Sequence, residues 1–247
     1  MKILSIDGSG NTASVAVAEE DKILAEYTVN HKKTHSQTLL PMVKTVLDML
    51  GLSVDDMDYI AVSNGPGSFT GLRICAATAK GLGLAAEKPM VGVKTLEALA
   101  YNYEGADCLV CPMMDARRSQ VYTGIYAFEK TSETENSDGF RLAVIEDQQA
   151  VPVEEILEKV NAQGKKVVFL GDGVPVYKDK IAGLVTVPYT LAPAGHDLQS
   201  AAALSRAAFA YIKDGKTVSA TELVPDYLRM SQAEREKLER GEKITAD

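Results

Sequence analysis

Two glycine-rich turns come closest to a chemistry-bearing motif in this 247-residue sequence. Residues 65–68 (GPGS) stand between an apolar run and a helix-forming segment, and residues 7–11 (DGSGN) stand between two apolar runs. Backbone amides exposed at a helix N-terminus bind phosphates, which suits residues 65–68, and the glycine-rich turn 7–11 between two strands is a second candidate for an anion. Neither is a P-loop, because Gly71 is followed by Leu72 and Arg73 rather than by Lys and Ser or Thr. The alternative interpretation is that the glycines only permit tight turns.

Other polar clusters are thinner. His31 and His35 stand four residues apart, but a zinc site normally takes three or four protein ligands, so both are interpreted as polar residues at a helix entrance. Cys108 and Cys111 are spaced like half a zinc site, yet they fall in a predicted strand and are interpreted as small buried hydrophobic residues. Residues 115–118 (DARR) carry both signs of charge, which suits a solvated turn or a domain-interface pair better than an anion site.

No serine stands with a histidine and an acid in a recognisable local motif. We therefore expect no catalytic residues, no cofactor-binding residues and no metal ligands in this chain.

Composition limits the partners. The chain holds 34 acidic residues against 26 Lys and Arg, a formal net charge of −8, which argues against extensive nucleic-acid contact by this chain alone. The N-terminus does not resemble a signal peptide, and no apolar run approaches the roughly 20 residues of a membrane span. Three cysteines without a disulfide framework suit a reducing cytoplasm, where we expect the protein to work.

The elements that position these residues occur in two similar series. In the first series, turn clusters separate three short strands, and helices then alternate with strands. Thr34 and Gln37 predict a capping box at the start of the first helix, and Gly51 predicts its end. The series comprises strands over 2–7, 13–18 and 23–29, a helix over 36–50, a strand over 59–62, a helix over 68–86, a strand over 90–93 and a helix from Thr95.

The second series repeats this order less regularly. It comprises strands over 108–114, 120–128 and 141–146, a helix over 153–162, strands over 166–170 and 184–188, and a helix over 198–213. The repetition predicts an internally duplicated α/β fold with two mixed-sheet subdomains, over residues 1–103 and 104–229. Residues 230–247 form a charged tail, expected to be a loosely held helix or disorder.

Two helices of the first series suggest a docking surface for a partner. The helix over 36–50 is apolar over a wider arc than one buried stripe requires, and in the helix over 68–86 Ala77 and Gly81 lie four apart. The alternative is a well-buried helix pair under the second subdomain. The expected interface residues are Leu39, Val43, Val46, Leu47, Leu50, Phe69, Leu72, Arg73, Ala76, Ala77, Lys80, Gly81 and Leu84.

Several motifs together resemble the TsaB (YeaZ) family. They are residues 3–7 (ILSID), 35–37 (HSQ), 65–73 (GPGSFTGLR), 113–118 (MMDARR) and 225–229 (PDYLR), and the resemblance runs in order from residue 1 to about residue 229. The 65–73 string is the most specific of them. Gly8 and Gly10 stand where the family commonly has Thr, and Cys75 stands where Gly is usual, so the first turn and the helix contact are expected to differ in detail from those of the family.

The resemblance implies a duplicated actin-like, sugar-kinase-like (ASKHA) fold. It also implies a role in the bacterial machinery that puts threonylcarbamoyl on the adenosine beside the anticodon of tRNAs reading codons that begin with A. The implied direct partner is TsaD, which transfers the group from its adenylate, and the ATPase TsaE joins them. The chain is expected to form a homodimer when TsaD is absent, and to meet tRNA only through the complex.

One departure from TsaD bears on catalysis. TsaD-type chains carry a His-x-x-x-His metal pair just after a Val-Gly-Val-type strand, and here the matching positions are Thr95 and Leu99, which cannot ligate a transition metal in that way. The resemblance therefore implies a non-catalytic scaffold, with metal and nucleotide on the partner subunits. The alternatives are a nucleotide-binding small-molecule kinase or ATPase, or a glycoprotease-like metallopeptidase of the same superfold; fold alone favours neither.

Overall fold

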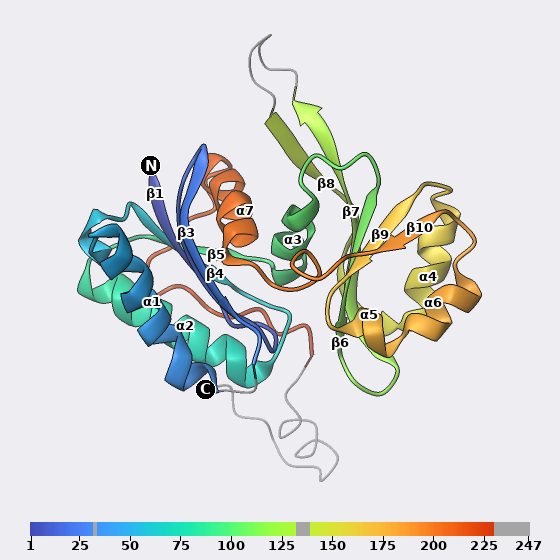
Figure 1. Ribbon diagram of the computed structural model, residues 1–247, viewed down its shortest axis with the longest axis horizontal. Helices are drawn as coiled ribbons and strands as arrows, with labels where there is room; N and C mark the ends of the chain where they lie inside the picture. The colour runs from blue at the N-terminus through green and yellow to red at the C-terminus, as the bar shows by residue number, and fades with distance from the viewer. Residues whose placement is uncertain (32–33, 132–138, 230–247) are drawn as a thin grey trace.

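The computed structural model describes residues 1–31, 34–131 and 139–229, and they form two lobes around two five-stranded mixed sheets (Figure 1). The first sheet has the order β3-β2-β1-β4-β5 and the second the order β10-β9-β6-β7-β8. Read from the other edge, the second order is β8-β7-β6-β9-β10, so both lobes place their strands identically along the chain. The predicted duplicated actin-like α/β fold is confirmed.

The first lobe follows the predicted meander closely. Antiparallel pairing joins β1 to β2 and β2 to β3, and parallel pairing adds β4 and β5 on the other side of β1. Its elements are β1 (Lys2–Asp7), β2 (Ala13–Glu19), β3 (Lys22–Val29), α1 (His35–Leu50), η1 (Val54–Asp56), β4 (Tyr59–Ser63), α2 (Phe69–Ala85) and β5 (Met90–Val93).

The second lobe repeats the pattern with a longer hairpin. The strands β7 and β8 pair over most of their length, and α4 and α6 pack together on this lobe. Its elements are β6 (Leu109–Asp115), β7 (Gln120–Thr131), β8 (Gly139–Pro152), α4 (Val153–Ala162), β9 (Val167–Leu170), α5 (Gly173–Val176), α6 (Lys178–Leu184) and β10 (Tyr189–Leu191). Between the lobes run α3 (Thr95–Ala100) and η2 (Tyr101–Tyr103).

The last helix, α7 (Ala201–Lys213), returns to the first lobe. It packs against β1, β2 and β5 on the face of the first sheet opposite to α1 and α2 (Figure 1). Leu204 and Phe209 contribute to this packing together with Ile3 and Val91. The first lobe therefore has three layers: α1 and α2, the first sheet, and α7. The third layer, α7, comes from the end of the segment predicted as the second subdomain, 104–229.

Three local expectations are corrected. The strand expected over 184–188 lies instead at Tyr189–Leu191, because Leu184 still belongs to α6, whose Ile181 is buried, and residues 185–188 form an irregular connection. The Thr34 side chain makes no capping hydrogen bond, although the Gln37 amide donates to the Thr34 carbonyl (2.9 Å). The last helix starts at Ala201, where the Ser200 side chain accepts the Ala203 amide. The predicted tail, 230–247, lies outside the described residues.

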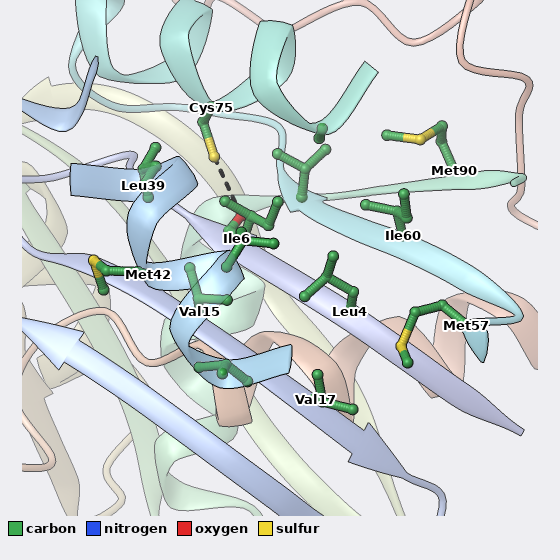
Figure 2. Close-up of a cluster of buried hydrophobic side chains, with 14 of the residues drawn as sticks. Leu4, Ile6, Val15, Val17, Leu39, Met42, Met57, Ile60, Cys75 and Met90 are labelled. Atoms are coloured by element: carbon green, nitrogen blue, oxygen red, sulfur yellow. Dashed lines mark hydrogen bonds between the residues drawn. The ribbon is translucent and has the colours of Figure 1, made fainter. Parts of the chain in front are cut away.

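The core under α1 and α2 fixes both helices to the first sheet. Figure 2 shows Leu39 of α1 next to Cys75 of α2, with Met42 further along α1 and with Leu4 and Ile6 of β1 in the same cluster. All five side chains are buried. The Cys75 thiol donates to the Ile6 carbonyl at 3.2 Å, so this small side chain both fills space and satisfies its donor. The inner faces of α1 and α2 are therefore fully used by the sheet.

Candidate functional site

Two amides of the glycine turn before α2, and the amide of the preceding Asn64, have partners inside the protein. The Ser68 amide donates to the Ser9 carbonyl (2.7 Å), the Asn64 amide to Val93 (2.7 Å) and the Gly65 amide to the Thr95 hydroxyl (3.2 Å). Ser68 also caps α2, since its hydroxyl accepts the Gly71 amide at 3.2 Å. Amides with these partners are not available to an anion, which favours the tight-turn interpretation.

The same glycines allow three stretches of backbone to touch. A Cβ on Gly67 would lie 2.3 Å from the Ser9 carbonyl oxygen, and one on Gly71 would lie 2.2 Å from that of Gly8. Gly65 has a φ of +112°, and a Cβ there would lie 2.1 Å from the Asp226 carbonyl oxygen. The GPGS turn thus packs directly on the 7–11 turn and on the C-terminal segment, and only glycine permits these approaches.

Thr95 and Leu99, where the resemblance places a histidine pair in TsaD, are core residues. Both are at most 1% exposed. The Thr95 amide donates to the Gly65 carbonyl (2.8 Å) while its hydroxyl accepts the Gly65 amide, so Thr95 ties α3 to the glycine turn. Leu99 packs with Val110 and Leu170 of the second lobe. These positions join the lobes and offer no ligand atoms to a transition metal.

Asp7 is buried at the end of β1. One of its carboxylate oxygens accepts from the Ser9 amide (2.9 Å), the Ser9 hydroxyl (2.7 Å) and the Ser63 hydroxyl (3.0 Å). Burial raises the pKa of Asp7 above its usual value, although these hydrogen bonds work in the opposite direction. Nearby, His35 Nε2 lies 2.8 Å from the Gly10 carbonyl oxygen, which places this histidine as a tie between α1 and the first turn. Both groups serve the packing of the turn.

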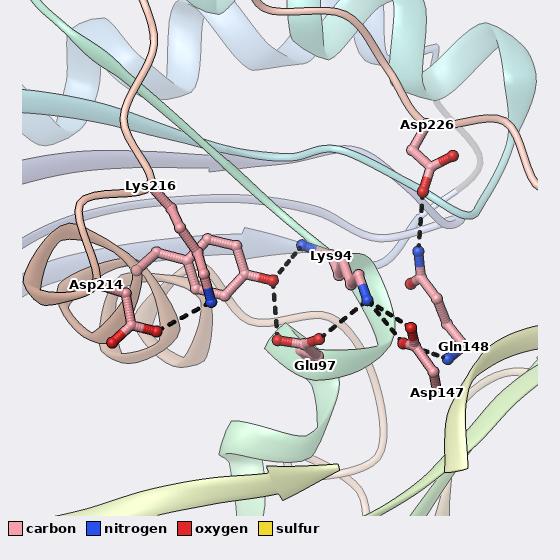
Figure 3. A network of polar contacts seen from close by, with 8 residues as sticks. Lys94, Glu97, Asp147, Gln148, Asp214, Lys216 and Asp226 are labelled. Carbon is pink, nitrogen blue, oxygen red and sulfur yellow. Dashed lines mark hydrogen bonds and ion pairs between the residues drawn. The ribbon is translucent and has the colours of Figure 1, made fainter.

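A polar network around Lys94 joins the two lobes (Figure 3). Lys94 Nζ lies 2.7 Å from one oxygen of Asp147 on β8 and 3.6 Å from Glu97 of α3. The Tyr211 hydroxyl of α7 donates to Glu97 at 2.8 Å. Burial lowers the pKa of Lys94, but its hydrogen bond to Asp147 and the charge of Glu97 outweigh that effect and raise it. Gln148 donates to Asp226 at 3.1 Å, which adds the C-terminal segment to the network.

A cavity of about 560 Å³ lies between the lobes. Ser68 and Asn11 line it from the first lobe, and Asp115, Arg117 and Asp172 line it from the second. Burial raises the pKa of Asp172. Arg117 lies 3.5 Å from Asp115 and donates its amide to the same carboxylate, as expected for a charge-balanced turn.

The cysteines are free thiols. Cys111 is buried, in agreement with the sequence prediction, whereas Cys108 precedes β6 and is half-buried. Among residues 1–31, 34–131 and 139–229, no three His, Cys, Asp or Glu side chains cluster as a metal site would require. Within those ranges, no helix is long and apolar enough to cross a membrane.

The expected docking residues divide by exposure. Six of them are buried: Leu39, Val43, Val46, Leu47, Leu72 and Ala76. The four on α1 pack in the core of the first lobe, so the wide apolar arc of α1 is covered by the first sheet and by α2. Leu50, Phe69 and Lys80 are half-buried.

Four of the expected residues are exposed and follow one another along α2. Arg73, Ala77, Gly81 and Leu84 are spaced so that they share one side of the helix, here named the α2 outer face. Leu84 is 56% exposed, and a Cβ placed on Gly81 would meet nothing within 4 Å. On α1, Leu40 (55%) and Met49 (82%) are exposed apolar residues that the expected set omitted. The sequence could have indicated their exposure, because their helical spacing from the buried residues of α1 places them on another side of that helix.

Comparison with known proteins gives a consistent assignment. The family model for TsaD, tRNA N6-adenosine threonylcarbamoyltransferase, matches residues 22–237. The chain is similar to the tRNA threonylcarbamoyladenosine biosynthesis protein TsaB of Bacillus subtilis, with 35% identity over 97% of this chain and 99% of that protein. It is 33% identical to TsaB of Escherichia coli over 94% of this chain and 96% of that protein. Among solved structures, YeaZ from Pseudomonas aeruginosa superposes with a TM-score of 0.75 at 30% identity, covering 92% of this chain and 99% of that chain.

Proposed function

The chain belongs to the TsaB family and takes part in threonylcarbamoyladenosine modification of tRNA, and from this premise we propose that it acts there as a non-catalytic subunit that docks on TsaD through α1 and α2. It works in the cytoplasm, and TsaE joins the assembly. The metal and the nucleotide belong to the partner subunits, and the tRNA is reached through the complex.

The α2 outer face is the observation that carries this proposal. Ala77 and Gly81 expose backbone and small side chains, and Leu84 adds an exposed apolar side chain at the same side of the helix. Small residues let a second helix approach closely, since the side chains at a contact set the distance between the axes. The helices α1 and α2 lie beside each other on one side of the first sheet (Figure 1), so both can meet a helix pair of a related subunit. Because TsaD matches the same family model, equivalent helices are expected on the partner.

A matched pair of glycine variants tests docking. Gly81→Arg places a long side chain on the α2 outer face, where the fold leaves it free space. Gly183→Arg makes the same change on α6 of the second lobe, at another exposed helical glycine whose Cβ would also meet nothing within 4 Å. We expect Gly81→Arg to lower TsaD affinity at least about a hundredfold, as central interface disruption does, while Gly183→Arg binds normally. Equal binding by both variants would refute docking through α2.

The residues Thr95 and Leu99 support the proposal that this chain is not the catalytic subunit. Their burial and their ties to Gly65 and to the second lobe give both a structural role where TsaD is expected to carry metal ligands. Without TsaD, the chain pairs with itself through the same face, since a two-fold pairing covers one patch twice. Sedimentation of the isolated chain at increasing concentration tests this, with Gly81→Arg as the monomeric control.

The cavity between the lobes is where the alternative function, a nucleotide-binding kinase or ATPase, can be tested. A kinase or ATPase of this superfold would bind nucleotide there, but the Ser68 and Gly65 amides that face the turn already have partners. Calorimetric titration of the isolated chain with ATP discriminates the two. Micromolar binding with turnover would favour the rival over a scaffold.

A further inference from the structure

The C-terminal segment 223–229, here named the strap, is tied to both lobes. Lys80 of α2 donates to the Leu223 carbonyl (3.0 Å), and the Asp226 amide donates to the Asn64 carbonyl (2.6 Å). At its far end, Arg229 donates to the Ala116 carbonyl (2.7 Å) of the second lobe. Gln148 of β8 adds a fourth contact through the Asp226 carboxylate, visible in Figure 3. The strap therefore has a fixed course across the start of α2.

The strap fixes one arginine of α2. The Tyr227 ring lies 4.9 Å from the Phe69 ring, measured between centroids, and the Arg73 guanidinium lies 4.1 Å from the Phe69 centroid. Arg73 Nε also donates to the Tyr227 hydroxyl at 3.3 Å. An exposed arginine normally loses much rotamer freedom when it binds a partner. Here the stacking and the hydrogen bond restrict the side chain in advance.

Arg73 has no acidic counterpart within the ranges that the structure describes. Its contacts there are the Phe69 ring and the Tyr227 hydroxyl, so only the Nε donor is engaged. The guanidinium fork still has donors in the geometry that a carboxylate or phosphate accepts in a bidentate manner. Although the chain has a net charge of −8, this oriented arginine has no acidic partner in the described ranges, so its free donors can bind an acceptor on another molecule.

We propose that Arg73, positioned by Phe69 and Tyr227, is an anchor of the docking surface and receives a carboxylate of the partner subunit. This proposal rests on the proposed function and extends it, because it adds the strap to the interface and specifies an acidic residue on the partner. A protein carboxylate is favoured over an RNA phosphate because the rest of the α2 outer face, Ala77, Gly81 and Leu84, is uncharged and suits a helix. Arginine and tyrosine at an interface centre are also frequent hot spots.

The test measures affinity of the full-length chain for TsaD with variants of this cluster. Arg73→Gln is expected to weaken binding at least about thirtyfold, the ratio that corresponds to a hot spot of about 2 kcal/mol. Arg73→Lys keeps the charge but loses the planar fork, so it should recover only part of the affinity. Tyr227→Phe keeps the ring contact and loses the hydroxyl, with an expected effect of about fivefold. Arg141→Gln, at an exposed arginine of β8, is the matched control and should bind normally.

The outcomes separate this proposal from the docking proposal. If Gly81→Arg abolishes binding while Arg73→Gln stays within twofold of the parent chain, docking stands and the anchor is wrong. If neither variant weakens binding, both proposals fail. If Arg73→Gln leaves TsaD affinity intact but weakens binding of tRNA to the assembled complex, the acceptor is a phosphate and the carboxylate assignment is overturned. Thermal unfolding of each variant, expected within a few degrees of the parent chain, excludes misfolding as the cause.

Discussion

Alanine substitutions at Gly71 and Gly81 of α2 should change stability in opposite directions. Gly81 is exposed, and a Cβ there would meet nothing within 4 Å. Glycine in a helix interior costs about 1 kcal/mol relative to alanine, so Gly81→Ala should stabilise the protein by about that amount. In a protein of this size, 1 kcal/mol corresponds to an increase of roughly 2–4 °C in the melting temperature.

Gly71 differs because its neighbour is backbone. A Cβ there would lie 2.2 Å from the Gly8 carbonyl oxygen, and neither of these two backbone segments can rotate away as a flexible side chain would. Overpacking of this kind costs about 3 kcal/mol, and the helix-propensity gain of about 1 kcal/mol leaves a net loss near 2 kcal/mol. Gly71→Ala should therefore lower the melting temperature by roughly 4–8 °C.

Denaturant titration and calorimetry of the two variants measure both effects under the same conditions. A stable Gly71→Ala variant would show that the 7–11 turn and the start of α2 do not pack as described. The tight-turn explanation of the GPGS motif would then fail, and an anion-binding role for its amides would return. A destabilised Gly81→Ala variant would show that the α2 outer face is not open.

Two further predictions concern titration and thiol access. Burial raises the pKa of Asp7 above its usual value of 3.8, so the stability from this group is present at low pH and is lost as pH rises through the folded-state value. Asp7→Asn should thus raise the melting temperature at pH 7 and lose that advantage near pH 4; a gain independent of pH would contradict this. Burial also raises the pKa of Cys111 to about 12 and that of Cys75 further. An aromatic disulfide reagent should therefore modify Cys108 alone in the folded protein, and reaction of all three thiols before unfolding would contradict the described core.

Local signals in the sequence predicted most of the elements. Short apolar runs separated by turn residues marked the strands of the first lobe, and Gly51 ended α1 in the left-handed conformation, with φ of 65°. The repeated order of elements also predicted the duplication. These features depend on neighbours along the chain, and a sequence exposes them directly.

Long-range packing was not predictable in the same way. The apolar arc of α1 suggested a surplus docking face, but Leu39, Val43 and Val46 are covered by the sheet and by α2. The reason for the glycines at 67 and 71 is the distant backbone of Ser9 and Gly8, which no local pattern reveals. Likewise, a helix pattern alone does not say which sheet it covers, and α7 crosses back to the first lobe.

Exposure along α2 separates the predicted docking residues into exposed and buried ones, and docking itself stays a prediction. The helical spacing of Arg73, Ala77 and Gly81 was visible in the sequence, and the structure leaves them exposed. The contribution of Tyr227 was not visible, since it comes from a segment more than a hundred residues away and reaches Arg73 only through the course of the strap.

Reconstitution of tRNA modification with purified subunits tests the central claim most directly. Threonylcarbamoyladenosine is measured on a substrate tRNA with TsaD and TsaE, with and without this chain, and with this chain alone. We predict product only when this chain accompanies TsaD, none from this chain alone, and loss of product with Gly81→Arg but not with Gly183→Arg. Product from this chain alone, or equal product in its absence, would contradict a non-catalytic subunit that acts by docking.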